Sequence, residues 1–310
     1  MRSDIEFDAN GITLRGWLYL PEQTVPPPPV VVMAHGFSAV KEMGLDDYAE
    51  VFCAAGLAVL VYDHRNLGAS DGWPRQEIDP FAQRRDYSHA ITYLQSLAVI
   101  DAQRIGVWGT SFTGGQVIVA AAVDRRIKCV VAQVPSLNTL ANLDICSTPA
   151  GISALYETID KERKSLAAGN PPTLIPVCSD DPSQPETSPG RRSWAYFNHF
   201  VSAGRAVWPG TFTTGSLELR LAYDALAFIE RVAPTPLLMI VATEDDITPT
   251  RIALAAYARA CEPKRLLLMA GHHYRPYLEG FEQSSRAACD WFVAHLSMTP
   301  TPLLPRGEFA

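Results

Sequence analysis

The residues best suited to chemistry lie in an apolar run that ends in Gly109-Thr110-Ser111 and continues through Phe112-Thr113-Gly114-Gly115 into a second apolar stretch. This pattern predicts a strand, a tight turn that carries a serine, and a helix. Small residues around the serine let the backbone adopt a strained conformation, which lifts the hydroxyl clear of the sheet at the helix N-terminus. A serine in this position is suited to nucleophilic attack if the chain also supplies a base, an acid and oxyanion donors.

Two later loops offer the base and the acid. Asp245 and Asp246 follow an apolar run that predicts a strand, and a carboxylate there can hold an imidazole in the required tautomer. His272 and His273 follow the next predicted strand and offer an imidazole as general base. The residue types alone leave the choice within each pair open.

Nucleophilic serines at turns of this kind often lie in a G-x-S-x-G pattern. The exact pattern does not occur around Ser111 but at Gly68-Ala69-Ser70-Asp71-Gly72, and Pro74 follows it closely. No helix is predicted to begin there, so Ser70 lacks the helix N-terminus that a nucleophilic turn needs. In the turn around Ser111 the corresponding fifth position is Thr113, and we expect the two glycines that follow to supply the room. The context therefore favours Ser111 over Ser70.

Elements of alternating type surround these residues. Residues 4–20 predict an antiparallel hairpin around Asn10-Gly11. Further strands are predicted at 30–34, 57–62, 105–109, 129–134, 236–242 and 265–269, and helices at 46–55, 82–97, 113–123, 249–261 and 278–296, with another helix ending near Val232. This alternation predicts an α/β fold with a mainly parallel sheet covered by helices on both faces, and a site at the carboxyl ends of the strands.

The regular alternation of predicted strands and helices is interrupted between about residues 136 and 218. A stretch of this length predicts an inserted, mostly helical cap rather than a loop. The core would then consist of residues 1–135 and 219–298. The Pro-rich tail, residues 299–310, is expected to be mobile.

Composition narrows the class of partner. The 310 residues are 47% hydrophobic and 19% charged with a net charge of −7, which gives no basic surface for nucleic acid or an anionic membrane. Six scattered cysteines without a C-x-x-C pair argue against a zinc site or a disulfide scaffold. We expect a cytoplasmic protein without cofactor or metal that binds a small molecule. A homodimer is left open.

Several segments share the pattern of a known superfamily: His35-Gly36-Phe37, Tyr62-Asp63-His64-Arg65, the turn at 109–115, Asp245 four residues before Pro249, and His273-Tyr274-Arg275-Pro276-Tyr277. Together they resemble the α/β-hydrolases. They are most similar to the dienelactone-hydrolase-like branch that includes fungal enzymes acting on polyketides. The resemblance covers the core on both sides of the insertion and not the cap.

The resemblance implies Ser111 as nucleophile, His273 as base and Asp245 as acid. His273 is preferred to His272 because it begins the His-aromatic-x-Pro-Tyr spacing of the pattern. Asp245 is preferred to Asp246 because of its distance from Pro249.

The resemblance also implies an oxyanion hole made of the backbone N–H groups of Phe37 and Phe112. A serine nucleophile implies an acyl-enzyme formed from an ester, thioester or lactone. Dehalogenases and epoxide hydrolases of this superfamily would have Asp at position 111, and dienelactone hydrolase itself would have Cys. The sequence leaves open whether water or an alcohol receives the acyl group, or whether the fold serves as a scaffold that binds or cyclises a metabolite.

Aromatic residues of the insertion suggest what the acyl group is. Trp194, Phe197 and Trp208 are candidates for a substrate pocket that takes a hydrophobic acyl group. The resemblance implies that this group is polyketide-derived, either free or carried on a protein. These rings could equally form the core of the cap itself.

Overall fold

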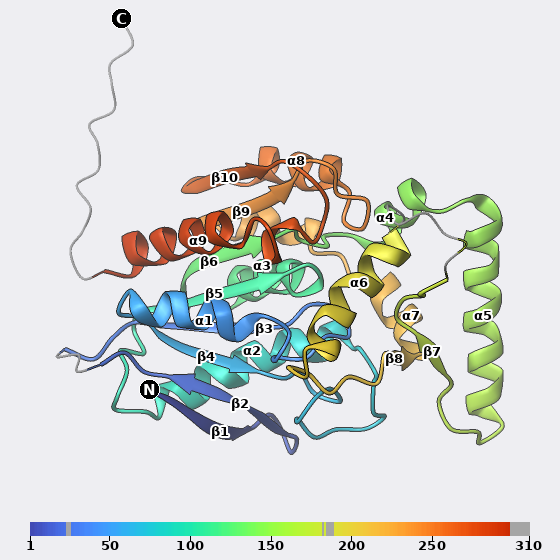
Figure 1. The fold of residues 1–310 in the computed structure, drawn as a ribbon, viewed down its shortest axis with the longest axis horizontal. Coiled ribbons are helices and arrows are strands. Elements are labelled where there is room, and N and C mark those ends of the chain that lie inside the picture. Colours follow the sequence, from blue (N-terminus) through green and yellow to red (C-terminus); the bar gives the residue numbers. More distant parts are fainter. Residues whose placement is uncertain (23–25, 182, 184–188, 298–310) are drawn as a thin grey trace, which may run out of the picture.

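An eight-stranded sheet forms the centre of the protein (Figure 1). The computed structural model describes residues 1–22, 26–181, 183 and 189–297. The strands lie in the order β1-β2-β4-β3-β5-β6-β9-β10. Their bounds are β1 Arg2–Asp8, β2 Thr13–Tyr19, β3 Val30–Ala34, β4 Ala58–Tyr62, β5 Ile105–Thr110, β6 Ile127–Gln133, β9 Leu237–Ala242 and β10 Lys264–Met269.

The sheet is parallel from β4 to β10, and the N-terminal hairpin makes it mixed. β1 pairs antiparallel with β2, and β2 pairs antiparallel with β4. The turn of the hairpin holds Asn10 at a φ of 61° and Gly11 at 84°, which these two residue types tolerate. The predicted fold class, a mainly parallel sheet with an antiparallel N-terminal hairpin, is therefore confirmed.

Helices cover both faces of the sheet because the central strands are apolar on both sides. On β3, Val30 and Val32 face one core and Val31 and Met33 the other. The first core packs against α2 (Pro80–Gln95), α3 (Phe112–Val123) and α8 (Thr250–Arg259). The second packs against α1 (Leu45–Ala54) and α9 (Phe281–Leu296). Strands buried on two faces read as unbroken apolar runs, which is why the sequence locates them well.

Between β6 and β9 the chain leaves the large sheet and lies beyond the carboxyl ends of its parallel strands, on the right in Figure 1. It forms α4 Thr139–Cys146, α5 Pro149–Ala167, β7 Leu174–Pro176, α6 Pro189–Ser202, β8 Thr211–Thr213 and α7 Gly215–Leu221. We call this region, residues 136–218 together with the end of α7, the insertion. An apolar cluster that includes Tyr196 and Phe200 of α6 joins it to Val40 and Met43 in the loop after β3.

Two features of the chain between β6 and β9 differ from the sequence prediction. β7 and β8 pair antiparallel as a second, two-stranded sheet that the sequence did not indicate. The helix expected to end near Val232 is replaced by a short 3-10 helix, η1 (Leu226–Arg231). The predicted mobile tail, residues 299–310, lies outside the described residues.

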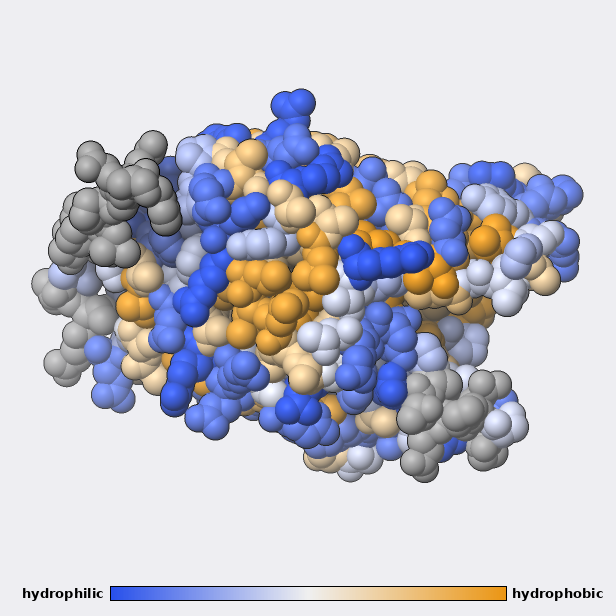
Figure 2. All heavy atoms as spheres, turned by 90° about the horizontal axis from the view of Figure 1, so that it is seen from above, coloured by the Kyte–Doolittle hydropathy of each residue, from blue (hydrophilic) through white to orange (hydrophobic). Residues whose placement is uncertain are grey.

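An apolar patch occupies the middle of the face seen in Figure 2, which looks down on the molecule from the side of β10 and α8. β10 is one of the two edge strands of the sheet, and Leu268 on it is 48% exposed. Within the described part of the chain, no helix is both long and apolar enough to cross a membrane.

Candidate active site

Ser111 lies at the turn between β5 and α3, the strand, turn and helix that the sequence predicts. Its φ of 53° and ψ of −116° belong to a region that residues other than glycine rarely adopt. Such a conformation persists only where the surroundings impose it. Here the N–H of Ser111 donates to the carbonyl oxygen of Gln133 at 2.9 Å. The turn thus presents the serine side chain at the N-terminus of α3.

Thr113 occupies the position where the usual motif has glycine. Its side chain is fully buried, and its hydroxyl accepts a hydrogen bond from the N–H of Thr110 at 2.9 Å. Neighbouring glycines provide the space: a Cβ on Gly109 would lie 2.3 Å from the carbonyl oxygen of Thr113, and one on Gly115 would lie 2.1 Å from that of Ser136. Threonine fits because it supplies a polar contact within the turn.

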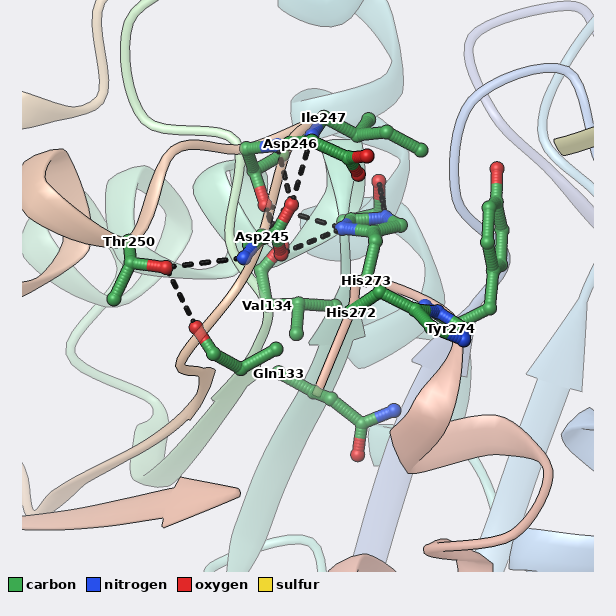
Figure 3. Close-up of polar contacts among 12 residues, drawn as sticks. Gln133, Val134, Asp245, Asp246, Ile247, Thr250, His272, His273 and Tyr274 are labelled. Carbon is green, nitrogen blue, oxygen red and sulfur yellow. Dashed lines mark hydrogen bonds and ion pairs between the residues drawn. The ribbon is translucent and has the colours of Figure 1, made fainter. Parts of the chain in front are cut away.

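His273 links the serine to a carboxylate. The loop after β10 holds its imidazole buried, with Nε2 3.0 Å from Oγ of Ser111. Nδ1 lies 2.8 Å from Oδ2 of Asp245 (Figure 3). With its proton on Nδ1, the imidazole donates to Asp245 and accepts from the serine hydroxyl. This is the hydrogen-bonding pattern of a serine nucleophile with its general base.

The loop after β9 fixes the carboxylate of Asp245. Oδ1 accepts the N–H groups of Ile247 at 3.0 Å and Thr248 at 2.7 Å. Oδ2 accepts the hydroxyl of Thr248 at 2.9 Å as well as His273. Burial raises the pKa of Asp245, but the attraction of His273 and the hydrogen bonds from His273 and Thr248 outweigh it, so the pKa lies below its ordinary value. The carboxylate therefore stays ionised at neutral pH.

The sequence reasoning missed Thr248. Its hydroxyl lies between Oδ2 of Asp245 and the carbonyl oxygen of Val134, which it approaches to 3.1 Å. An Asp that accepts N–H groups two and three residues later forms an Asx turn, and that local signal could have found the threonine.

The neighbouring histidine and aspartate make other contacts. Nδ1 of His272 accepts the N–H of Tyr274 at 3.2 Å. Oδ2 of Asp246 pairs with a guanidinium nitrogen of Arg192 at 2.6 Å. The structure therefore brings His273 and Asp245, and not His272 and Asp246, together with the serine.

Ser70, the serine of the literal motif, is buried in a loop and has other partners. Its hydroxyl donates to the carbonyl oxygen of Asp63 at 2.6 Å and accepts the N–H of Arg15 at 2.9 Å. These bonds occupy the hydroxyl and tie the loop to β2. The loop position that the sequence predicts for Ser70 is confirmed.

The two predicted oxyanion donors border the same space as the serine. Phe112 is the first residue of α3, so its N–H has no acceptor within the helix. Phe37 follows Gly36, where an added Cβ would lie 3.3 Å from Cβ of Ser111. Both phenylalanines line the cavity beside Ser111. The oxyanion role of their N–H groups stays a prediction.

A cavity of about 300 Å³ opens at Ser111 and His273. This volume is at the lower end of the range for small-molecule sites. The aromatic side chains that line it come from the core and from the insertion, and they include Phe37, Phe112, Tyr196, Phe197, Phe212 and Tyr277.

The three aromatic residues predicted for the pocket differ in their position relative to the cavity. Phe197 lines the cavity. Trp208 stacks on Phe197 with ring centroids 4.3 Å apart and planes 10° from parallel, and its Nε1–H donates to the carbonyl oxygen of Ser38 at 2.6 Å. Trp194, half-buried on α6, is not among the described residues that line the cavity. Arg220, which the sequence prediction did not include, also lines the cavity.

Comparison with known proteins agrees with this architecture. Residues 10–165 match the X-Pro dipeptidyl-peptidase (S15) family. The chain is 34% identical to the thiohydrolase aneE of Aspergillus aculeatus over 275 residues, 85% of this chain and 83% of that protein. It is 31% identical to a thiohydrolase of Eupenicillium brefeldianum, covering 90% of this chain and 89% of the relative.

A solved structure extends the comparison to three dimensions. The α/β hydrolase GrgF from Penicillium sp. sh18 superposes with a TM-score of 0.81 and 27% identity, covering 96% of this chain and 99% of that one. The polyketide transferase grgF of Penicillium sp. is 28% identical in sequence, over 91% of this chain and 92% of the relative. On fold, family match and sequence identity together, the chain belongs to the α/β-hydrolases, and its relatives include fungal thiohydrolases and a fungal polyketide transferase.

Proposed function

We propose that this protein is a serine thiohydrolase that forms an acyl-enzyme on Ser111 from a hydrophobic, polyketide-type thioester. The observation that carries the proposal is the continuous hydrogen-bonded chain from Ser111 through His273 to Asp245 at the wall of a cavity. We choose a thioester as the substrate because two relatives are named thiohydrolases. An ester or a lactone would react by the same chemistry.

Each step uses a group that the site provides. His273 takes the hydroxyl proton on Nε2 while Oγ of Ser111 bonds to the carbonyl carbon. The N–H groups of Phe37 and Phe112 hold the negative charge that develops on the carbonyl oxygen. As the carbon–sulfur bond breaks, His273 returns the proton to the sulfur and the acyl group remains on the serine. Water then attacks, gives its proton to His273, and the carboxylic acid leaves as the serine regains its proton.

In this proposal the insertion, whose last helix carries it from the predicted boundary at residue 218 to Leu221, acts as a cap, and the large sheet with its helices is the catalytic core. The insertion's aromatic side chains Tyr196, Phe197 and Phe212 line the cavity opposite the serine turn. Rings of this kind suit an apolar or aromatic acyl group, and a closed cap would exclude bulk water from the acyl-enzyme.

Acyl transfer to an alcohol is the second candidate. It is favoured by the name of GrgF as a polyketide transferase, since that protein shares both fold and sequence with this chain. The two reactions share the acyl-enzyme and differ only in the group that attacks it. Mass spectrometry of the products from an acyl N-acetylcysteamine thioester, with and without added alcohol, separates them. Free acid alone supports hydrolysis, and an ester product supports transfer.

A fluorophosphonate probe tests the nucleophile directly. Wild-type protein should be labelled at one serine, and Ser111→Ala should abolish the label. Ser70→Ala is the matched control, because Ser70 lies in the literal motif but is bonded to the loop backbone. Labelling that survives Ser111→Ala, or that Ser70→Ala alone removes, would overturn the proposal.

A further inference from the structure

Arg220 on α7 brings a positive charge to the cavity beside Ser111. Its side chain is half-buried, and the guanidinium carbon lies 5.0 Å from the ring centroid of Phe37. Among the residues that the structure describes, no carboxylate pairs with this guanidinium, and no acceptor takes a hydrogen bond from it. The guanidinium of Arg220 contacts the ring of Phe37 instead. A cation over an aromatic face gains only about 0.5–2 kcal/mol.

Arg65 and Arg126, which are also half-buried, differ from Arg220 in having a carboxylate partner. Arg65 pairs with Asp86, and Arg126 pairs with Asp124 at 2.6 Å. A guanidinium has five donors in a planar fork that matches a carboxylate or a phosphate. A half-buried guanidinium without a protein acceptor has lost part of its hydration, so an anionic group that arrives with a ligand would supply the partner that the described residues do not.

No carboxylate of the described cavity lining competes for the guanidinium. None of its described lining residues is an aspartate or glutamate. The nearby carboxylate on the same helix, Glu218, points elsewhere and pairs with Arg163 at 2.6 Å. Burial lowers the pKa of Arg220 to about 10, so it remains charged at neutral pH in surroundings that disfavour the charge.

Neutral polar groups accompany the arginine. Thr139 and Asn142, one turn apart on α4, line the same cavity. α4 packs against α7, and a backbone bridge joins Asn138 to Asp224 just beyond the two helices. The aromatic lining from α6 and β8 is apolar by comparison. The cavity therefore combines an apolar wall with a polar, cationic one.

We propose that Arg220 binds an anionic oxygen group of the substrate while the acyl carbon is at Ser111. The inference rests on the proposed thiohydrolase function and names its substrate class: an acyl thioester that carries a carboxylate or similarly acidic oxygen. The same chemistry could come from the acyl chain or from the phosphate of a phosphopantetheine leaving group, and the test below distinguishes the two.

The first arm compares acyl chains that differ in charge. The substrates are the N-acetylcysteamine thioester of adipic acid, with a free terminal carboxylate, and its methyl ester. The measured quantity is the ratio of kcat/KM for the charged over the neutral substrate. Arg220→Gln should lower this ratio about 10- to 100-fold, chiefly through KM, and Arg220→Lys should restore part of it. The control Arg259→Gln, at an exposed ion pair with Glu230, should leave the ratio unchanged.

The second arm keeps a neutral hexanoyl chain and compares N-acetylcysteamine with phosphopantetheine as the thiol. A selective loss for Arg220→Gln in this arm assigns the anion to the leaving group, and a loss in the first arm assigns it to the acyl chain. Equal losses for charged and neutral substrates in both arms, or no change in either ratio, would overturn the proposal.

A binding measurement separates this inference from the proposed reaction. If the wild-type protein cleaves none of the thioesters, the thiohydrolase proposal fails, and calorimetry with the adipoyl thioester still tests the arginine. The protein for this titration carries Ser111→Ala, alone or combined with Arg220→Gln. Tighter binding of the charged than the neutral ligand, lost on removal of Arg220, supports the anion site; equal binding of both ligands overturns it.

Discussion

The substitution Asp245→Asn tests the proposed triad sharply because the structure dictates how the new side chain must lie. Oδ1 of Asp245 accepts backbone N–H groups from Ile247 at 3.0 Å and Thr248 at 2.7 Å. These donors require an oxygen at that position. The amide nitrogen of the asparagine must therefore take the place of Oδ2, which lies 2.8 Å from Nδ1 of His273 (Figure 3).

The consequence is a change of tautomer rather than a loss of structure. An amide nitrogen cannot accept the Nδ1 proton, so the imidazole of His273 carries its proton on Nε2, which faces Oγ of Ser111 at 3.0 Å. Nε2 can then no longer take the proton of the serine. In Ser-His-Asp triads the same change lowers kcat about 10⁴-fold. That factor corresponds to about 5.4 kcal/mol of transition-state stabilisation.

Initial rates with a neutral acyl N-acetylcysteamine thioester measure the effect, and thermal unfolding verifies that the variant is folded. Asp246→Asn is the matched control, because its carboxylate pairs with Arg192 and not with the imidazole. It should retain kcat within about threefold. An Asp245→Asn enzyme that keeps more than about a tenth of the wild-type kcat, or equal losses in both variants, would refute the reasoning.

Three further measurements address stability. Gly109→Ala would bring a Cβ within 2.3 Å of a backbone oxygen and should cost about 1–3 kcal/mol in urea unfolding, whereas Gly190→Ala, with open space at its Cβ, should change little; equal effects would contradict the packing argument. Trp208→Phe keeps an aromatic ring but loses the hydrogen bond to the Ser38 carbonyl, for which we expect about 1 kcal/mol in the same assay, and an unchanged stability would exclude it. Because the pKa of Asp245 is lowered by folding, its stabilisation is complete above about pH 4 and is lost as the pH falls through the lowered pKa. The stability advantage of the wild type over Asp245→Asn should therefore shrink on acidification, and an advantage that grows would reverse the sign of the pKa shift.

Most of the large sheet could be predicted because the burial of each strand can be recognised from the residues of that strand alone. β3 (Val30–Ala34) is apolar throughout and coincides with its predicted bounds, since a strand buried on both faces needs no polar residue. The hairpin followed from Asn10-Gly11. By contrast, β7 and β8 have three residues each, and a period of two leaves no recognisable pattern over so short a length.

The site likewise has a part that could be predicted from the sequence and a part that could not. The serine turn and the order of the loops follow from strands and helices, so Ser111 and the two candidate pairs could be located from sequence. Which histidine of the pair meets the serine depends on loop geometry that residue types do not encode. Arg220 lies on a short helix of the insertion, and only the folded chain brings it to the cavity.

The hydrogen bond from Trp208 to the carbonyl of Ser38 joins the aromatic wall of the cavity to the loop after β3. Ser38 directly follows Phe37, whose N–H is one of the two proposed oxyanion donors, while Trp208 stacks on Phe197 in the wall of the cavity. A movement of the insertion that admits a long acyl chain would also pull on the backbone that holds this donor. The enzyme would then be inactive while open and would gain its full set of donors on closing, so that an acyl-enzyme forms where bulk water has already been displaced.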